Sequence, residues 1–247
     1  MEVLKYRDAA EMGEKAAAVA AGRIGGAIAA GGRARIVVST GQSQFFFLDA
    51  LRRQAVDWTK VEMFHLDEYI GLDERHPASF VRYLKERFTR GLPFARVRYI
   101  DGMADPQAEV AALSAEIAER PVDVAFIGIG ENAHIAFNDP PADFETGAPY
   151  LVVNLNDTCK RQQVREGWFA TEADVPAQAI TMSPRRIMDS RVILSVVPFA
   201  VKAAAVGDMM RSGLDNRIPA TILKGHPDCT LFLDEESGRL LPGCPTA

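Results

Sequence analysis

Residues 128–141, GIGENAHIAFNDPP, combine side chains that could carry out proton transfer. They overlap the end of the apolar run 122–129, which predicts a buried strand, so His134 falls just beyond a strand end, where α/β sheets keep their ligand sites. Imidazole exchanges protons near neutral pH, and Asp139 could orient the ring. The pattern indicates an acid–base site, and the alternative is a histidine with a purely structural function.

A second candidate site lies after the predicted strand 60–66, where Asp67 and Glu68 are adjacent. Partial burial raises the pKa of a carboxyl group, so one of the two could act as a general base. The alternative is an acidic turn or the start of a helix. We expect His65 to be structural and His76 to precede a helix, and no HxxxH or similar spacing indicates a metal site.

An anion site is predicted where the strand 35–39 runs into a helix that begins after Ser43. The turn is rich in hydroxyl groups and consists of Ser39, Thr40, Gly41, Gln42 and Ser43. Free N–H groups and the helix dipole favour phosphate at such a position, although serine and threonine are also ordinary helix caps. Lys202, after the predicted strand 191–198, lies in a first helical turn where the dipole disfavours a cation, which favours an anionic partner.

The elements that must position these residues alternate along the chain. Helices are predicted over residues 9–30, after Ser43, over 79–88 and 106–119, and from about 200; strands are predicted over 35–39, 60–66, 97–100, 122–129, 150–155 and 191–198. Apolar strands separated by amphipathic helices predict an α/β fold with a mainly parallel sheet and helices on both faces. The loops after the strands then meet along one edge, and 247 residues suit a single domain, residues 1–247.

Composition and charge point to a globular protein of the cytoplasm. The net charge of -5 gives no reason to expect a nucleic-acid partner, and the alanine-rich run 16–30 is interrupted by Arg23, so we expect a packed helix and no membrane span. Cys159, Cys229 and Cys244 form no CxxC pair, which argues against a disulfide framework or a thiolate zinc site. The first residues lack the pattern of a signal peptide.

Two blocks of the sequence resemble the glucosamine-6-phosphate deaminase family, also called glucosamine-6-phosphate isomerase. They are HLDEYIG with HPASF at residues 65–80, and GIG with HIAFNDP at residues 128–140. The likeness runs from about residue 37 to residue 234 and is most specific at HIAFN. It implies a modified Rossmann-type α/β fold, shared with 6-phosphogluconolactonase and ribose-5-phosphate isomerase, and an enzyme without a metal or organic cofactor.

The resemblance also implies a reaction, the conversion of glucosamine 6-phosphate into fructose 6-phosphate and ammonia. Asp67 would move a proton between C2 and C1 of the opened sugar, and His134 would assist ring opening. Asp139, where the family usually has glutamate, would orient His134. The phosphate would be bound by Thr40, Gly41, Gln42, Ser43 and Lys202.

The sequence departs from the family pattern in the loop that carries His134. The family typically reads GNDGH, whereas residues 130–134 read GENAH, so an acid is replaced by Asn132. An amide can hydrogen-bond but cannot neutralise an imidazolium. Glu131 could substitute for the missing acid, although its neighbouring position would normally point its side chain elsewhere.

The predicted phosphate site also departs from the family. Gln42 and Gln44 occupy the places of a second glycine and a proline, and residues 157–165 contain no clean match to the family's phosphate-binding arginine. Arg161 and Arg165 are both candidates for that function.

Two other functions are compatible with the same residues. In a 6-phosphogluconolactonase-like hydrolase His134 would activate water, but that family tends to have Asp-Glu-Arg and His-Thr-Ala-Ser where this chain has Asp-Glu-Tyr and HIAFN. A non-catalytic sugar-phosphate sensor is favoured only by the loss of an acid at Asn132. The expected partner is a small-molecule sugar phosphate, and the sequence leaves a homo-oligomer open.

Overall fold

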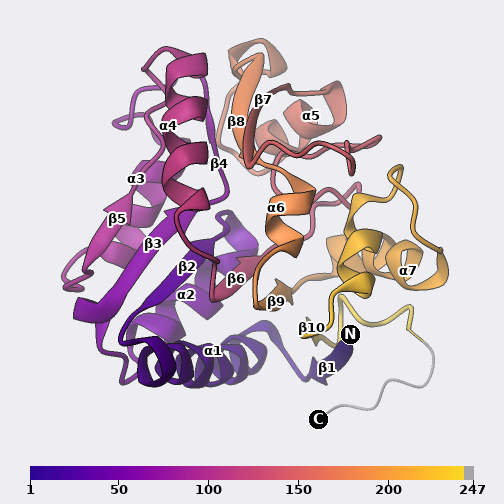
Figure 1. The fold of residues 1–247 in the computed structure, drawn as a ribbon. Helices are drawn as coiled ribbons and strands as arrows, with labels where there is room; N and C mark the ends of the chain where they lie inside the picture. Colours follow the sequence, from indigo (N-terminus) through magenta and orange to yellow (C-terminus); the bar gives the residue numbers. More distant parts are fainter. Residues whose placement is uncertain (242–247) are drawn as a thin grey trace.

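The computed structural model describes residues 1–241, which contain a seven-stranded sheet in the order β1-β10-β9-β6-β2-β3-β5. Its strands are β1 Glu2–Tyr6, β2 Ala34–Val38, β3 Val61–His65, β5 Arg96–Arg98, β6 Val124–Ile127, β9 Val192–Val197 and β10 Cys229–Asp234. Every neighbouring pair is parallel, so the carboxyl ends of the strands share one edge. The prediction of a mainly parallel sheet is confirmed (Figure 1).

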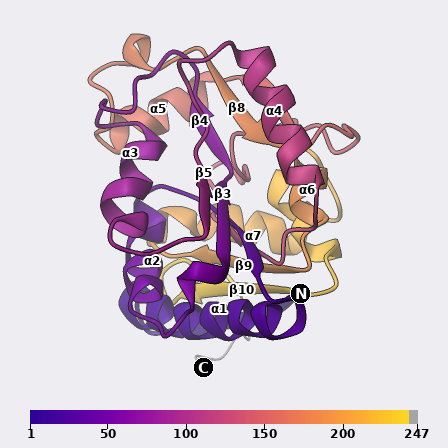
Figure 2. The ribbon, with the colours of Figure 1, turned by 60° about the vertical axis from the view of Figure 1, so that its left-hand side comes forward.

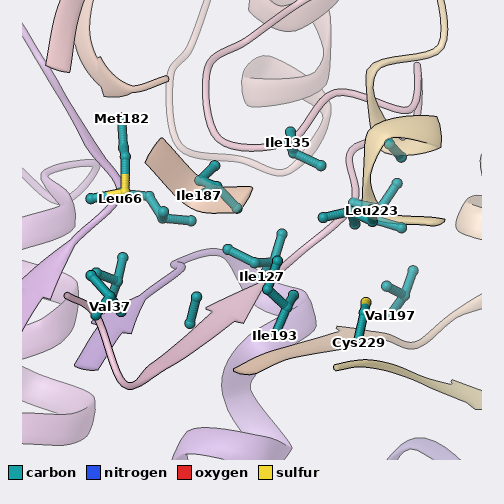
Figure 3. Packing of buried hydrophobic residues seen from close by; sticks show 14 of the residues in the cluster. Val37, Leu66, Ile127, Ile135, Met182, Ile187, Ile193, Val197, Leu223 and Cys229 are labelled. Carbon is teal, nitrogen blue, oxygen red and sulfur yellow. The ribbon is translucent and has the colours of Figure 1, made fainter. Parts of the chain in front are cut away.

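Helices cover both faces of this sheet, as predicted. They are α1 Ala9–Gly31, α2 Phe45–Arg52, α3 Phe80–Leu84, α4 Pro106–Ala118, α5 Asp157–Arg165, α6 Pro184–Met188 and α7 Ala203–Arg211. Adjacent residues of β2 point to opposite faces: Ile36 packs with residues of α1 and α2, and Val37 packs with residues of α4, α6 and α7. Figure 2 shows α1 across the sheet from α4 and α6, and Figure 3 shows Val37, Ile127 and Ile187 in the second of these clusters.

The strands at one end of the sheet, β1 and β10, were not predicted from the sequence. β1 is an edge strand, and its charged residues Glu2 and Lys5 hide the apolar alternation. β10 is buried throughout, and the run TLFL at residues 230–233 is the signal that would have identified it.

A second, three-stranded sheet lies beyond the carboxyl edge of the first. It consists of β4 Asp67–Tyr69, β8 Gln178–Met182 and β7 Tyr150–Asn154, all antiparallel. The prediction that residues 150–155 join the parallel sheet is wrong, because an apolar run shows burial but not its partner, and β7 pairs with β8. Figure 1 shows β4, β7, β8 and α5 grouped at the top of the molecule, and the chain enters this group directly from β3.

No helix in the described part of the chain has the length and apolar character needed to cross a membrane. Cys159 and Cys229 are buried free thiols, and Cys244 lies outside the described residues.

Candidate active site

A cavity of about 330 Å³ lies between the carboxyl edge of the main sheet and the smaller sheet. Its walls come from the loops after β2, β6 and β9, from the start of β4, and from α5 with the residues that follow it. The four strand ends singled out in the sequence therefore meet in one place. The lining includes Ser39, Thr40, Gly41, Gln42, Ser43, Asp67, His134 and Lys202.

Asp67 is the first residue after the crossing from β3 to the smaller sheet, and only 6% of it is exposed. Burial raises the pKa of its carboxyl group to about 8, and the neighbouring charge of Glu68 adds to this effect. A hydrogen bond from the backbone N–H of Phe137 lowers the pKa and opposes both effects. Burial and the charge of Glu68 both favour the protonated form of Asp67.

Glu68 has a structural function, because it alternates with Asp67 along β4 and lies against a second cavity. Its carboxylate accepts hydrogen bonds from Ser79 Oγ at 2.9 Å, from Phe80 N at 3.2 Å and from Val81 N at 2.8 Å. Burial raises the pKa of Glu68 above its ordinary value, although these hydrogen bonds act in the opposite direction. The carboxylate thus holds the first turn of α3, and Asp67 remains the candidate base.

His65 and His76 both have structural contacts, as expected from the sequence. His65 is fully buried, its Nε2 atom accepts the Ile100 N–H at 2.8 Å, and burial lowers its pKa to about 3. His76 Nδ1 accepts the Ala78 N–H at 3.1 Å in the turn before α3.

The His134 ring is placed by a tight turn after β6. The Gly130 N–H donates to His134 O at 2.9 Å, and the Ala133 N–H donates to Gly130 O at 3.1 Å. Ala133 has a φ of 64°, a conformation that L residues rarely adopt. A Cβ atom on Gly130 would lie 2.2 Å from His134 Cε1, so only glycine leaves space for the ring here.

Asp139 is the acid beside His134, with 3.2 Å between Asp139 Oδ1 and His134 Nδ1. Asn132 bridges the two residues: its Nδ2 donates to Asp139 Oδ1 at 3.0 Å, and its Oδ1 accepts the His134 N–H at 3.2 Å. Burial raises the pKa of Asp139, but His134 and Asn132 outweigh it, and the net pKa lies below the ordinary value. The amide that replaces the family's acid therefore positions another acid next to the ring.

Glu131 does not substitute for that acid, because its carboxylate forms an ion pair with Arg165 at the end of α5. Arg165 lines the cavity, and so does Glu131. Arg161, the other candidate arginine, is exposed and donates to Thr158 Oγ1 at 3.1 Å outside the cavity lining.

The loop after β2 is held in place by its two unusual glutamines. Gly41 has a φ of 101°, which requires glycine, and the loop continues into the 3-10 turn Gln42–Gln44. Gln44 is fully buried and its Nε2 donates to Val196 O at 3.0 Å, while Gln42 Nε2 donates to Glu166 O at 3.1 Å. The glutamines thus tie the loop to β9 and to the segment after α5.

Lys202 is 6% exposed and reaches the cavity from the 3-10 turn Ala200–Lys202. Burial lowers its pKa, and Glu166 and Glu131 oppose this effect. The turn follows Phe199, whose φ is 82° and whose N–H donates to Asp234 Oδ2 at 2.9 Å. The polar end of this cavity thus combines Lys202, Arg165 and the loop after β2.

Several lining residues were not anticipated from the sequence: Phe80, Phe137, Gln162, Gln163, Glu166 and Trp168. Gln163 is 6% exposed and its Oε1 accepts the Tyr69 hydroxyl at 2.8 Å. The adjacent glutamines of the polar helix α5 were the signal available in the sequence. Among residues 1–241, no three His, Cys, Asp or Glu side chains are grouped to hold a metal ion.

A family model described as glucosamine-6-phosphate isomerases/6-phosphogluconolactonase matches residues 7–231. The glucosamine-6-phosphate deaminase of Bacillus cereus (strain G9842) is 33% identical over 201 residues, which cover 81% of this chain and 75% of that protein. A solved structure described as a monomeric glucosamine-6-phosphate deaminase superposes with a TM-score of 0.89 at 27% identity and covers 97% of this chain and 100% of its own. The 6-phosphogluconolactonase of Trypanosoma brucei has a TM-score of 0.81 at 15% identity, over 97% of this chain and 98% of its own, which shows a shared fold.

Proposed function

Because the chain belongs to the family of glucosamine-6-phosphate isomerases and 6-phosphogluconolactonases, we propose that it converts glucosamine 6-phosphate and water into fructose 6-phosphate and ammonia. The observation that carries this proposal is the meeting of Asp67, the His134–Asp139 pair and Lys202 in one cavity. The relatives named as deaminases support the choice of substrate.

Ring opening is the function of His134 in this proposal. Its Nδ1 faces Asp139, which leaves Nε2 for the sugar. That nitrogen exchanges a proton with the ring oxygen and the anomeric hydroxyl, and a ring held next to a carboxylate keeps the correct orientation for both transfers.

Asp67 then carries out the isomerisation. Its carboxylate takes the proton from C2 of the open aldose and returns it to C1, while the aldehyde oxygen gains a proton and the amino nitrogen loses one. The product is a ketose imine, which water hydrolyses to fructose 6-phosphate and ammonia. A base with a pKa of about 8 matches this step, because a basic carboxylate removes a carbon-bound proton more readily than an ordinary one.

In this proposal the phosphate binds at the polar end of the cavity, near Lys202 and the loop after β2. The residues assigned to it are the backbone and hydroxyl groups of Ser39, Thr40, Gly41, Gln42 and Ser43, with Lys202 and Arg165. We assign Arg165 in place of Arg161, since Arg165 lines the cavity. We place the reaction in the cytoplasm, where free thiols such as Cys159 and Cys229 remain reduced.

Ammonia release from glucosamine 6-phosphate tests the proposal, with hydrolysis of 6-phosphogluconolactone measured in parallel. We expect ammonia from the wild-type protein and none from His134→Ala. Lactone hydrolysis alone would instead select the hydrolase, because the His134–Asp139 pair could activate water without Asp67. Binding of fructose 6-phosphate without either reaction would indicate a sensor.

A further inference from the structure

Two oppositely charged residues face each other at the cavity, Glu131 after β6 and Arg165 at the end of α5. The two side chains are 23% and 57% exposed and form an ion pair. The pair joins the loop that carries His134 to the segment that covers the cavity. Glu131 therefore contacts the same arginine that the proposed function assigns to the phosphate.

The other acid at this end of the cavity, Glu166, is bound within its own segment. Its Oε1 accepts from Gln162 Nε2 at 2.7 Å, and its Oε2 accepts from Trp168 Nε1 at 3.0 Å. Glu131 and Glu166 both favour the charged form of Lys202 and raise its pKa, but Glu131 is the acid that pairs with Arg165.

We propose that Glu131 is a positioning residue that sets the affinity and specificity for the anionic end of the substrate. Its carboxylate neutralises and orients Arg165, and an incoming phosphate must replace it there. This inference rests on the proposed function.

The exchange favours phosphate over weaker anions. A phosphate monoester carries up to two negative charges and three acceptor oxygens, so it competes for a guanidinium better than a single carboxylate does. A neutral sugar carries no anionic group that could replace the Glu131 carboxylate at Arg165. Glu131 thereby makes binding weaker in absolute terms but more selective for a sugar phosphate.

Calorimetric titration with fructose 6-phosphate, and separately with inorganic phosphate, tests the inference in a double-mutant cycle. Glu131→Gln should lower the Kd roughly two- to fivefold, the size expected for one exposed ion pair. In an Arg165→Gln background, Glu131→Gln should have a clearly smaller effect, because only its action on Lys202 is left. KM for the sugar phosphate should fall in step with the Kd.

Two matched variants separate this pairing from the loss of a charge in general. Glu166→Gln removes a carboxylate from the same cavity that does not pair with Arg165, so its effect should be equal in both backgrounds. Glu172→Gln removes an exposed carboxylate from the 3-10 turn Glu172–Asp174, outside the cavity lining, and should leave the Kd unchanged.

An unchanged or higher Kd for Glu131→Gln would overturn the inference, and so would the same decrease with and without Arg165. Both titrations measure binding alone. Absence of ammonia release would thus remove the proposed function without affecting this result, whereas turnover without coupling would remove only the inference about Glu131.

Discussion

At the scale of single residues, the surroundings of Asp67 favour its protonated form. Burial and the nearby charge of Glu68 raise its pKa to about 8, although a base must be ionised to accept a proton. A cationic amino group entering the cavity would favour the ionised form, so an amino sugar would help to generate the proposed base. Ionisation of this buried carboxyl group therefore opposes folding.

Asp67→Asn should lower kcat by at least about 100-fold and stabilise the fold at neutral and alkaline pH. The folded-state pKa is raised from 3.8, so ionisation of Asp67 opposes folding increasingly as the pH rises from about 4 to about 8. The gain in the free energy of unfolding should be on the order of a few kcal/mol above pH 8 and vanish below pH 4. Thermal unfolding at several pH values checks this, and unchanged turnover would remove Asp67 from the mechanism.

The activity of the wild-type protein should depend on the same ionisation. We expect kcat/KM to rise with pH through a midpoint near pH 8 and to level off above it, because the free enzyme must lose the Asp67 proton. Glu68→Gln removes the like charge and should move the midpoint to lower pH, while Glu172→Gln should leave it unchanged. A midpoint that Glu68→Gln does not move would contradict this electrostatic coupling.

At the scale of elements, the turn after β6 shows how backbone geometry places a side chain. Gly130 has no side chain where the His134 ring lies, with 2.2 Å from a hypothetical Cβ atom to Cε1 and 2.3 Å to Nε2. Gly130→Ala should displace the ring from Asp139 and lower kcat about 10- to 100-fold, the cost of a misplacement of about 1 Å. Gly147→Ala, where a Cβ atom would meet nothing within 4 Å, is the matched control, and equal kinetics in the two variants would refute the steric argument.

The same elements show what the sequence could reveal. Parallel strands could be predicted from their apolar runs, and the residues at their carboxyl ends do meet in one cavity. The sequence could not show which of Asp67 and Glu68 faces the cavity, because this depends on the pairing of the three-residue strand β4 with β8. Likewise, no local pattern distinguishes Arg165 from Arg161; only the packing of α5 against the loop after β6 does.

At the scale of the whole molecule, the cavity lies between the main sheet and the α5 segment, and side-chain contacts join the two. Gln42 Nε2 donates to Glu166 O, and Glu131 pairs with Arg165, across the boundary between the main sheet and the α5 segment. A ligand that contacts both sides would add further links. Contacts between residues more than 30 positions apart carry no signal in a single sequence, which is why these bridges could not be predicted.

Such a ligand should stabilise the whole fold, which gives the last prediction. Fructose 6-phosphate at 100 times its Kd should add about 2.7 kcal/mol to the free energy of unfolding and raise Tm by roughly 5–10 °C. Lys202→Ala should abolish most of this shift at the same concentration, because it removes a buried cation from the proposed phosphate site, whereas Lys15→Ala on the exposed side of α1 should preserve it. Burial of the Lys202 cation is unfavourable and lowers its pKa, so its removal should not lower the Tm of the unliganded protein by much. A full shift in the Lys202 variant would place the phosphate elsewhere in the cavity.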